Sequence, residues 1–298
     1  MKDKTPPPKI PLPKALLTIA VSTCLIFGSC FFSFLYYKHL KDKRRSDPSF
    51  QIVAVVQTSA DAEGLKTAYL TELLDLSVDR PQNIFSFNTQ EAKQKLMSVP
   101  FIKMAHITKI RPGTLHVDYT LRKPIAYYAD YLNTAIDAEG ILFPFKPFFT
   151  PKNLPEIITG EDISPDIWGK KITGEKIDLA FSVLALTAQN SDDKMSVRRI
   201  DVSNAFASSN GKRQIVITLE DRIIRVIDGD AVLCVYPRVL RLSTENYKQQ
   251  MTNYTTLRSY LREQDRVNPL SIKGKVQQAK PTIIDLRLSD LAFIAADK

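Results

Sequence analysis

Residues 100–126 read PFIKMAHITKIRPGTLHVDYTLRKPIA, a pattern that indicates a helix end followed by two strands. Pro100 ends a short helical segment, and Arg111-Pro112-Gly113 is typical of a turn. Residues 102–110 read as the first strand, with a less regular alternation. In the second strand, apolar residues alternate with polar ones, which predicts a half-buried strand: Leu115, Val117, Tyr119 and Leu121.

The preceding sequence supplies the rest of a small domain. Residues 50–56 read as a strand, and residues 64–76 as a helix with apolar side chains on one face. Asn88, with Glu91 three residues later, is a signature of a second helix start. The order strand, helix, helix, strand, strand predicts a three-stranded sheet covered on one face by two helices.

An uncharged apolar run precedes this domain. Residues 15–37 carry no charge, and a helix of that length spans about 34 Å, enough for a hydrocarbon core of about 30 Å. A cleaved signal peptide is the alternative, but its apolar region usually has about 7–15 residues and ends in small residues. This run ends in aromatic residues, including Tyr36 and Tyr37, which suit a membrane interface. The sequence therefore predicts an uncleaved transmembrane helix.

The charges beside this run leave its orientation open. More basic residues follow it than precede it, which slightly disfavours export of the C-terminal part: Lys2, Lys4, Lys9 and Lys14 before it, and Lys38, Lys41, Lys43, Arg44 and Arg45 after it. Long domains translocate largely regardless of such counts. A chain with its large domain in the cytosol, acting as a regulator, is therefore one alternative.

The net charge of +9 is concentrated near the apolar run. Residues 1–47 carry +6 of it and residues 48–298 only +3. Basic residues beside a membrane helix meet anionic lipid. The nearly balanced remainder counts against a phosphate-binding footprint, so we expect no nucleic-acid partner.

Few residues suggest catalysis or metal binding. Ser191-Asp192-Asp193-Lys194 fits the S-x-x-K pattern of penicillin-binding proteins, but it follows an apolar helix and no K-T-G comes after it. His39, His106 and His116 lack cysteines or carboxylates at metal-ligand spacing. The sequence also lacks a phosphate-binding glycine loop. We therefore predict no enzyme activity, no metal and no cofactor.

Residues 127–298 predict a second, β-rich domain with flanking helices, so the fold class is α+β. Cys234 is the only cysteine beyond the apolar run, so no disulfide can form there, and we expect it to be buried. The predicted elements are a turn at 137–140, helices at 175–190 and 244–264, strands at 200–202, 215–219 and 223–227 with a hairpin turn at 220–222, and an alternating segment at 281–293.

These elements resemble a known family. The strand–helix–helix–strand–strand unit resembles a POTRA domain, and the detailed pattern is similar to the FtsQ/DivIB bacterial cell-division proteins. The chain departs from the family at Leu121, where Glu is frequent, and at Val56-Gln57-Thr58, where Val-x-Gly is usual. The resemblance is carried by Phe50, Val55, residues 83–85, Leu96, Pro100, Ile102, Ala105, Ile107, Pro112, Leu115, Arg122, Pro124, Ala126, 136–143, 154–160 and 284–287.

The resemblance implies a non-enzymatic, single-pass protein of the bacterial inner membrane at the division septum. Its N-terminus would be cytoplasmic and its C-terminal domain extracytoplasmic. The implied parts are a proline-rich tail (1–14), a transmembrane helix (15–37), a juxtamembrane stalk (38–48), a POTRA domain (49–126) and a β domain (127–298). The tail is either a docking peptide for a proline-recognising partner or a stiff extended segment.

In that family the C-terminal strand region recruits a small single-span coiled-coil division protein of the FtsB/FtsL type. A strand at the free edge of a sheet has unpaired backbone groups that a partner strand can pair with. Whether Asp285 and Arg287 face the partner or only solvent stays open. Carried over by motif, the predicted partner-binding residues are Ile283, Ile284, Asp285, Leu286, Arg287, Leu288, Leu291 and Phe293.

POTRA sheets also bind partners at their edges, so residues 50–56 and 114–121 form a second predicted surface for other septal proteins. The alternative function is a POTRA-bearing membrane protein that assists polypeptide export or envelope assembly. Such proteins usually carry repeated POTRA units or a barrel, and the sequence shows neither a second such unit nor barrel-like strands.

Overall fold

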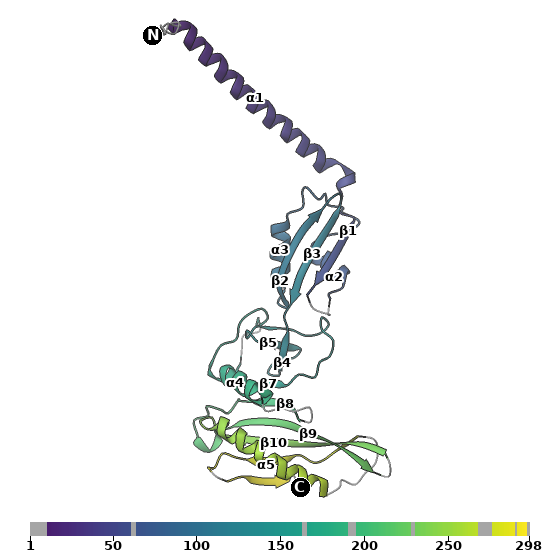
Figure 1. Ribbon diagram of the computed structural model, residues 1–298, viewed down its shortest axis with the longest axis vertical. Coiled ribbons are helices and arrows are strands. Elements are labelled where there is room, and N and C mark those ends of the chain that lie inside the picture. The colour runs from purple at the N-terminus through teal and green to yellow at the C-terminus, as the bar shows by residue number, and fades with distance from the viewer. Residues whose placement is uncertain are drawn as a thin grey trace, which may run out of the picture. The chain divides into compact units, whose positions relative to one another are not determined.

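The computed structural model describes residues 11–60, 64–162, 166–189, 195–227, 230–267, 276–289 and 291–296 (Figure 1). The predicted α+β class is confirmed. The chain divides into two compact units. The first unit comprises Met1–Thr58, Lys66–Leu96 and Ala105–Tyr119, and the second comprises Ser59–Leu65, Met97–Met104 and Thr120–Lys298.

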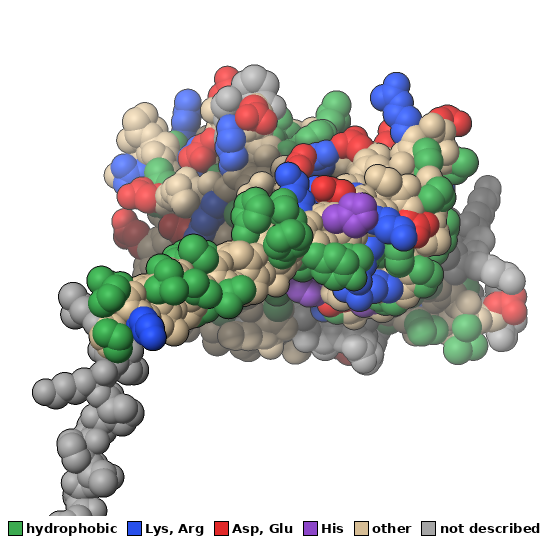
Figure 2. All heavy atoms as spheres, turned by 90° about the horizontal axis from the view of Figure 1, so that it is seen from above, with side chains coloured by type: hydrophobic (Ala, Val, Ile, Leu, Met, Phe, Trp, Pro, Cys, Tyr) green, Lys and Arg blue, Asp and Glu red, His purple; other side chains and the backbone are tan. Residues whose placement is uncertain are grey.

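A long helix, α1 (Leu12–Ser46), contains the whole predicted membrane span. Within the described part of the chain it is the one helix long and apolar enough to cross a membrane, and its apolar side chains are exposed. Figure 2 shows these hydrophobic side chains gathered along the helix. The helix continues through most of the predicted stalk because no helix breaker occurs before Pro48, which holds Asp47 in an extended conformation. Most of the predicted proline-rich tail, residues 1–10, lies outside the described residues.

The predicted order strand, helix, helix, strand, strand is confirmed, and the three strands form a sheet in the order β1-β3-β2. Leu115 and Val117 of β3 are buried, as the alternation predicts, together with Leu70 of α2 and Leu96 of α3. The first strand begins later than predicted because Pro48–Phe50 forms a 3-10 turn. The elements are β1 (Ala54–Ser59), α2 (Thr67–Leu73), α3 (Thr89–Met97), β2 (Ile102–Ile110) and β3 (Thr114–Leu121).

The remaining strands form one large sheet in the order β13-β12-β10-β9-β8-β7-β4-β5-β6, with β11 also paired to β10. Two helices, α4 (Glu175–Gln189) and α5 (Tyr247–Val267), accompany the sheet, close to their predicted positions. The strands are β4 (Pro124–Tyr128), β5 (Thr134–Asp137), β6 (Leu142–Pro144), β7 (Glu156–Ile158), β8 (Met195–Asp201), β9 (Ile215–Ile227), β10 (Asp230–Leu242), β11 (Val276–Gln278), β12 (Thr282–Asp285) and β13 (Phe293–Ala296).

The hairpin turn predicted at Glu220-Asp221-Arg222 is wrong. Strand β9 runs through these residues without interruption and pairs with β10 along its whole length, with Asp221 opposite Tyr236. Asp221 is buried and bound by Arg258 of α5, so a polar residue that suggests a turn instead lies inside a strand.

The buried clusters of the second unit include a main core and a smaller one apart from it. The main core joins α4 and α5 to the sheet through buried side chains such as Val183, Tyr254 and Leu240. The smaller core lies on the β9–β10 hairpin and consists of Ile223, Val232, Cys234 and Tyr236. Cys234 is therefore buried, as predicted.

Candidate partner-binding surface

Strand β12, which holds Ile283, Ile284 and Asp285 of the predicted partner-binding residues, is an internal strand. On one side it pairs in parallel with β10, and on the other it pairs antiparallel with β13, where Asp285 lies opposite Phe293. The prediction that residues 283–288 provide a free strand edge is therefore wrong. After Leu288 the chain turns back and adds one more strand, so the end of the sheet is β13.

The predicted residues divide into buried and exposed sets. Ile284 and Leu286 are buried in the main core, and Ile283 is half-buried. Leu288, Leu291 and Phe293 are 66%, 65% and 70% exposed. Large apolar side chains with this much exposure on one short segment favour an interaction surface over a packing role.

Ile294 extends the exposed apolar set, although sequence reasoning did not single it out. It is 43% exposed and follows Phe293 directly in β13. Successive strand residues point to opposite faces of a sheet, so these two side chains lie on different faces of the terminal strand. The sequence does carry a signal for Ile294, because two large apolar residues in succession are unusual in a strand that is buried on one face only.

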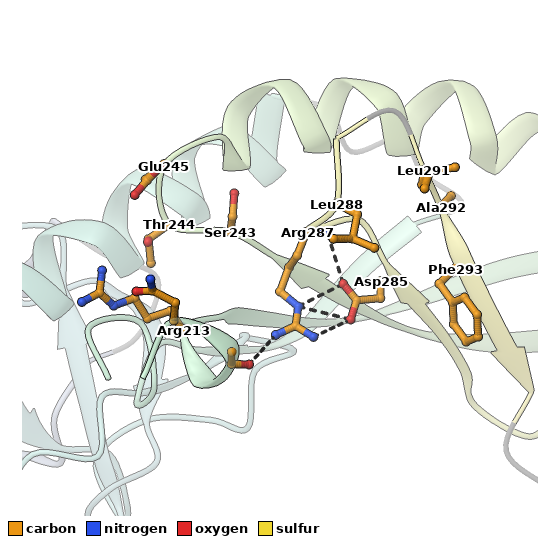
Figure 3. Close-up of a pocket in the computed structure, with 12 residues that line it drawn as sticks. Arg213, Ser243, Thr244, Glu245, Asp285, Arg287, Leu288, Leu291, Ala292 and Phe293 are labelled. Carbon is orange, nitrogen blue, oxygen red and sulfur yellow. Dashed lines mark hydrogen bonds and ion pairs between the residues drawn. The ribbon is translucent and has the colours of Figure 1, made fainter. Parts of the chain in front are cut away.

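Two hollows lie beside the exposed residues. The larger, of about 680 Å³, is lined by Ser243, Glu245 and Arg213 (Figure 3). It is also lined by five of the predicted residues: Asp285, Arg287, Leu288, Leu291 and Phe293. The smaller, of about 430 Å³, has residues of α5 such as Asn253 on its wall. Leu288, Leu291 and Ala292 line both hollows. Leu288, Leu291 and Ala292 thus offer apolar contact area beside space for a partner's side chains.

Asp285 and Arg287 bind each other beside the larger hollow. Nη2 of Arg287 lies 2.7 Å from Oδ2 of Asp285, and its Nε donates to Oδ1 at 3.0 Å. Nη1 of Arg287 donates to the carbonyl oxygen of Gly211 at 3.0 Å (Figure 3). This guanidinium is therefore held within its own chain.

The pKa of the Asp285 carboxyl lies below its ordinary value. Burial alone would raise this pKa, but the hydrogen bonds from the side chain and backbone of Arg287 outweigh burial. The pKa of Arg287 is raised in turn, chiefly by its hydrogen bond to Asp285. The pair is therefore charged at neutral pH and supports the turn that leads to Leu288.

The structure also corrects part of the second predicted surface. Strand β3 is the central strand of the three-stranded sheet, so residues 114–121 offer no free edge, and the prediction of an edge there is wrong. Strand β1 is an edge strand, and a hollow of about 440 Å³ beside it is lined by Val53 and Val78, which are 83% and 97% exposed.

No cluster of three or more His, Cys, Asp or Glu side chains that could hold a metal is found among the described residues. His116 contacts Thr58, with 3.1 Å between Nε2 and Oγ1, and Thr58 donates to Asp118. The S-x-x-K segment at 191–194 lies outside the described residues.

Residues 62–119 match the family model described as "POTRA domain, FtsQ-type". A search of curated proteins gave no match. The matched residues end within β3 and cover most of the predicted POTRA unit. The chain therefore carries an FtsQ-type POTRA domain after an N-terminal apolar helix, an arrangement consistent with a protein of the FtsQ/DivIB family.

Proposed function

We propose that the protein is a non-enzymatic, single-pass membrane scaffold of the bacterial division machinery that recruits another division protein through the terminal strand of its large sheet. The FtsQ-type POTRA domain and the apolar helix α1 support a division-related membrane protein. The observation that carries the proposal is the exposed apolar set at the end of the sheet, Leu288, Leu291, Phe293 and Ile294.

Binding would occur by strand addition to β13. Among the described strands β13 pairs only with β12, and strand addition would use the backbone groups on its other side. Phe293 and Ile294 would contact side chains of the added strand, one on each face of the sheet. Leu288 and Leu291 would pack against partner side chains that enter the hollows. Backbone pairing supplies affinity, and the hollows select the sequence.

The proposed partner is a small single-span coiled-coil division protein of the FtsB/FtsL type. In this proposal the N-terminus is cytoplasmic, and the POTRA domain (49–126) and β domain (127–298) act outside the inner membrane at the septum. Such a partner is also anchored by one transmembrane helix, so its extracytoplasmic part would lie on the same side of the membrane as the β domain. Other septal proteins would bind the edge of β1.

Co-purification with the full chain tests this proposal. Leu291→Asp should abolish recovery of the coiled-coil partner, because a carboxylate would have to be buried against an apolar partner surface. Leu132→Asp is the matched control, since Leu132 is 95% exposed and lies outside the C-terminal segment. Full recovery of the partner with Leu291→Asp would refute the proposal, as would equal loss with both variants.

A role in polypeptide export is the second candidate, and the hollow beside the β1 edge favours it. An extended polypeptide could pair with β1 in the same way as a partner strand. A fluorescent tag before Met1 separates the two functions in dividing cells. A band at the division plane supports the scaffold, whereas a uniform envelope signal supports export.

A further inference from the structure

Two arginines from distant parts of the first unit converge on one aromatic ring. Arg44 lies in the last turn of α1, and Arg111 follows β2 directly. Their guanidinium carbons lie 5.9 Å and 5.4 Å from the centre of the Phe85 ring. Phe50 contacts this ring edge-on, with 5.0 Å between the ring centres. Both guanidinium groups thus contact the same aromatic side chain.

The end of α1 is attached to the segment that carries Phe85. Nδ2 of Asn83 donates to the carbonyl oxygen of Arg44 at 2.9 Å and to that of Asp47 at 3.1 Å. Oδ1 of Asn83 accepts from the backbone N–H of Phe85, also at 2.9 Å. A single side chain therefore fixes the position of Arg44 relative to the Phe85 ring.

Two further cations lie in the same region. Lys109 donates to the carbonyl oxygen of Phe87 at 2.6 Å, and its pKa is lowered by burial and by the nearby charge of Arg45. Within the described residues, Arg44, Arg45, Lys109 and Arg111 form no ion pair. Asp47, the acidic residue next to them in sequence, accepts hydrogen bonds from Ser49 instead.

We propose that Arg44, Arg45, Lys109 and Arg111 form a binding site for the phosphate groups of anionic lipids in the leaflet from which α1 emerges. Like charges held close together disfavour one another unless an anion neutralises them. Arginine side chains match phosphate oxygens in a two-pronged geometry, and an arginine is weakly enough hydrated to bind at such an interface. The site joins the end of the membrane helix to the folded domain.

The distance from the membrane fits this occupant. Arg44 follows the last residue of the uncharged run, Tyr37, by a helical rise of about 10 Å, and headgroups extend about 5–7 Å beyond the hydrocarbon core. Helical side chains lean toward the N-terminus, here toward the membrane, and long basic side chains reach back to the interface. The lipid of the bilayer that α1 spans is therefore the anion nearest to the site.

Native mass spectrometry of the full chain in detergent, titrated with phosphatidylglycerol or phosphatidylcholine, tests the proposal. The native protein should retain phosphatidylglycerol in preference, and Arg111→Gln should weaken this retention about fivefold, as expected for one basic residue at an anionic surface. Arg111 lies outside α1, so its replacement leaves the membrane helix unchanged. Circular dichroism should show the same spectrum for both proteins.

Lys248→Gln is the matched control, because Nζ of Lys248 also lies over an aromatic ring, 5.9 Å from the centre of Tyr247, but in α5 of the second unit. This variant should retain phosphatidylglycerol as the native protein does. Equal retention of the two lipids, or undiminished retention by Arg111→Gln, would overturn the proposal. Displacement of the lipid by millimolar inorganic phosphate would also overturn it, because the site would then be a general anion site.

Discussion

Asp221 in the middle of β9 accepts a hydrogen bond of 2.7 Å from Nε of Arg258 in α5, and both side chains are almost completely buried. A second link joins Asp265 of α5 to Arg238 of β10, and Arg238 also donates to Oγ1 of Thr282 in β12 at 2.8 Å. These contacts attach α5 to β9 and β10, and Arg238 extends them to β12, the strand that supports the proposed binding edge.

Removing one member of the Asp221–Arg258 pair should destabilise the second unit strongly. Arg258→Leu leaves a buried carboxylate without its cation, a change that costs about 3–5 kcal/mol. The double variant Asp221→Leu/Arg258→Leu should be more stable than Arg258→Leu alone, because it removes the uncompensated charge. Urea unfolding of the three proteins measures this, and a double variant less stable than the single one would contradict the electrostatic explanation.

Exposed and buried residues of the predicted partner segment should differ in what their replacement affects, partner binding or stability. Phe293→Ser changes an exposed side chain, so we expect a stability change within about 0.5 kcal/mol and a loss of partner binding. Ile284→Ser empties a fully buried position and should cost about 2–4 kcal/mol. Thermal unfolding and co-purification of both variants check this contrast. If Phe293→Ser binds the partner normally, the edge is not the binding site.

Gly113 should tolerate no side chain. A Cβ atom at this position would lie 2.0 Å from the carbonyl oxygen of Gln51, which is part of the backbone. Gly113 also accepts backbone hydrogen bonds from Val53 and Ala54. Gly113→Ala should therefore displace the entry to β1 and destabilise the POTRA domain by about 1–3 kcal/mol. Gly211→Ala is the control, because a Cβ there meets no atom within 4 Å.

The Asp285–Arg287 pair should make stability depend on acid pH. The pKa of Asp285 is lowered from its ordinary value of 3.8, so the folded state binds the proton less tightly than the unfolded chain. The pair therefore stabilises the fold above about pH 3.8, and this stabilisation is lost as the pH falls through the folded pKa.

Asp285→Asn lacks this carboxylate, so its melting temperature should lie below that of the native protein at pH 6. The difference should shrink as the pH falls below about 3.8. Melting curves of the two proteins between pH 2 and pH 7 measure the effect. A difference that stays constant over this range would show that the ion pair does not contribute.

Local patterns predict the POTRA unit well, because each of its elements carries its own signal. Strand β2 lies where the sequence places it, and the turn at Arg111-Pro112-Gly113 joins it to β3. The helix predicted at 175–190 corresponds to α4 for the same reason. Short alternating or amphipathic segments with defined ends can be predicted without knowing which elements they pack against.

The large sheet shows what local patterns miss. The buried position of Asp221 depends on Arg258, which lies far away in sequence, so no local signal distinguishes a strand interior from a turn there. The edge of the sheet depends on the pairing of residues 282–285 with residues 293–296, which short apolar segments do not specify. The contacts of Arg122 could not be predicted from local sequence either. Its side chain binds Asp137 at 2.7 Å and the carbonyl oxygen of Pro100, and neither contact is indicated by the residues around Arg122.

The separate small core on the β9–β10 hairpin has a practical consequence for Cys234. The buried cluster in this region is small, so the region should open more readily than the main core, on its own and without global unfolding. Each opening would expose a thiol that is 1% accessible in the closed state. In a chain whose Cys24 and Cys30 are replaced by serine, the rate of alkylation of Cys234 would thus report the rate at which the hairpin opens. The same measurement would show whether a bound partner slows this opening.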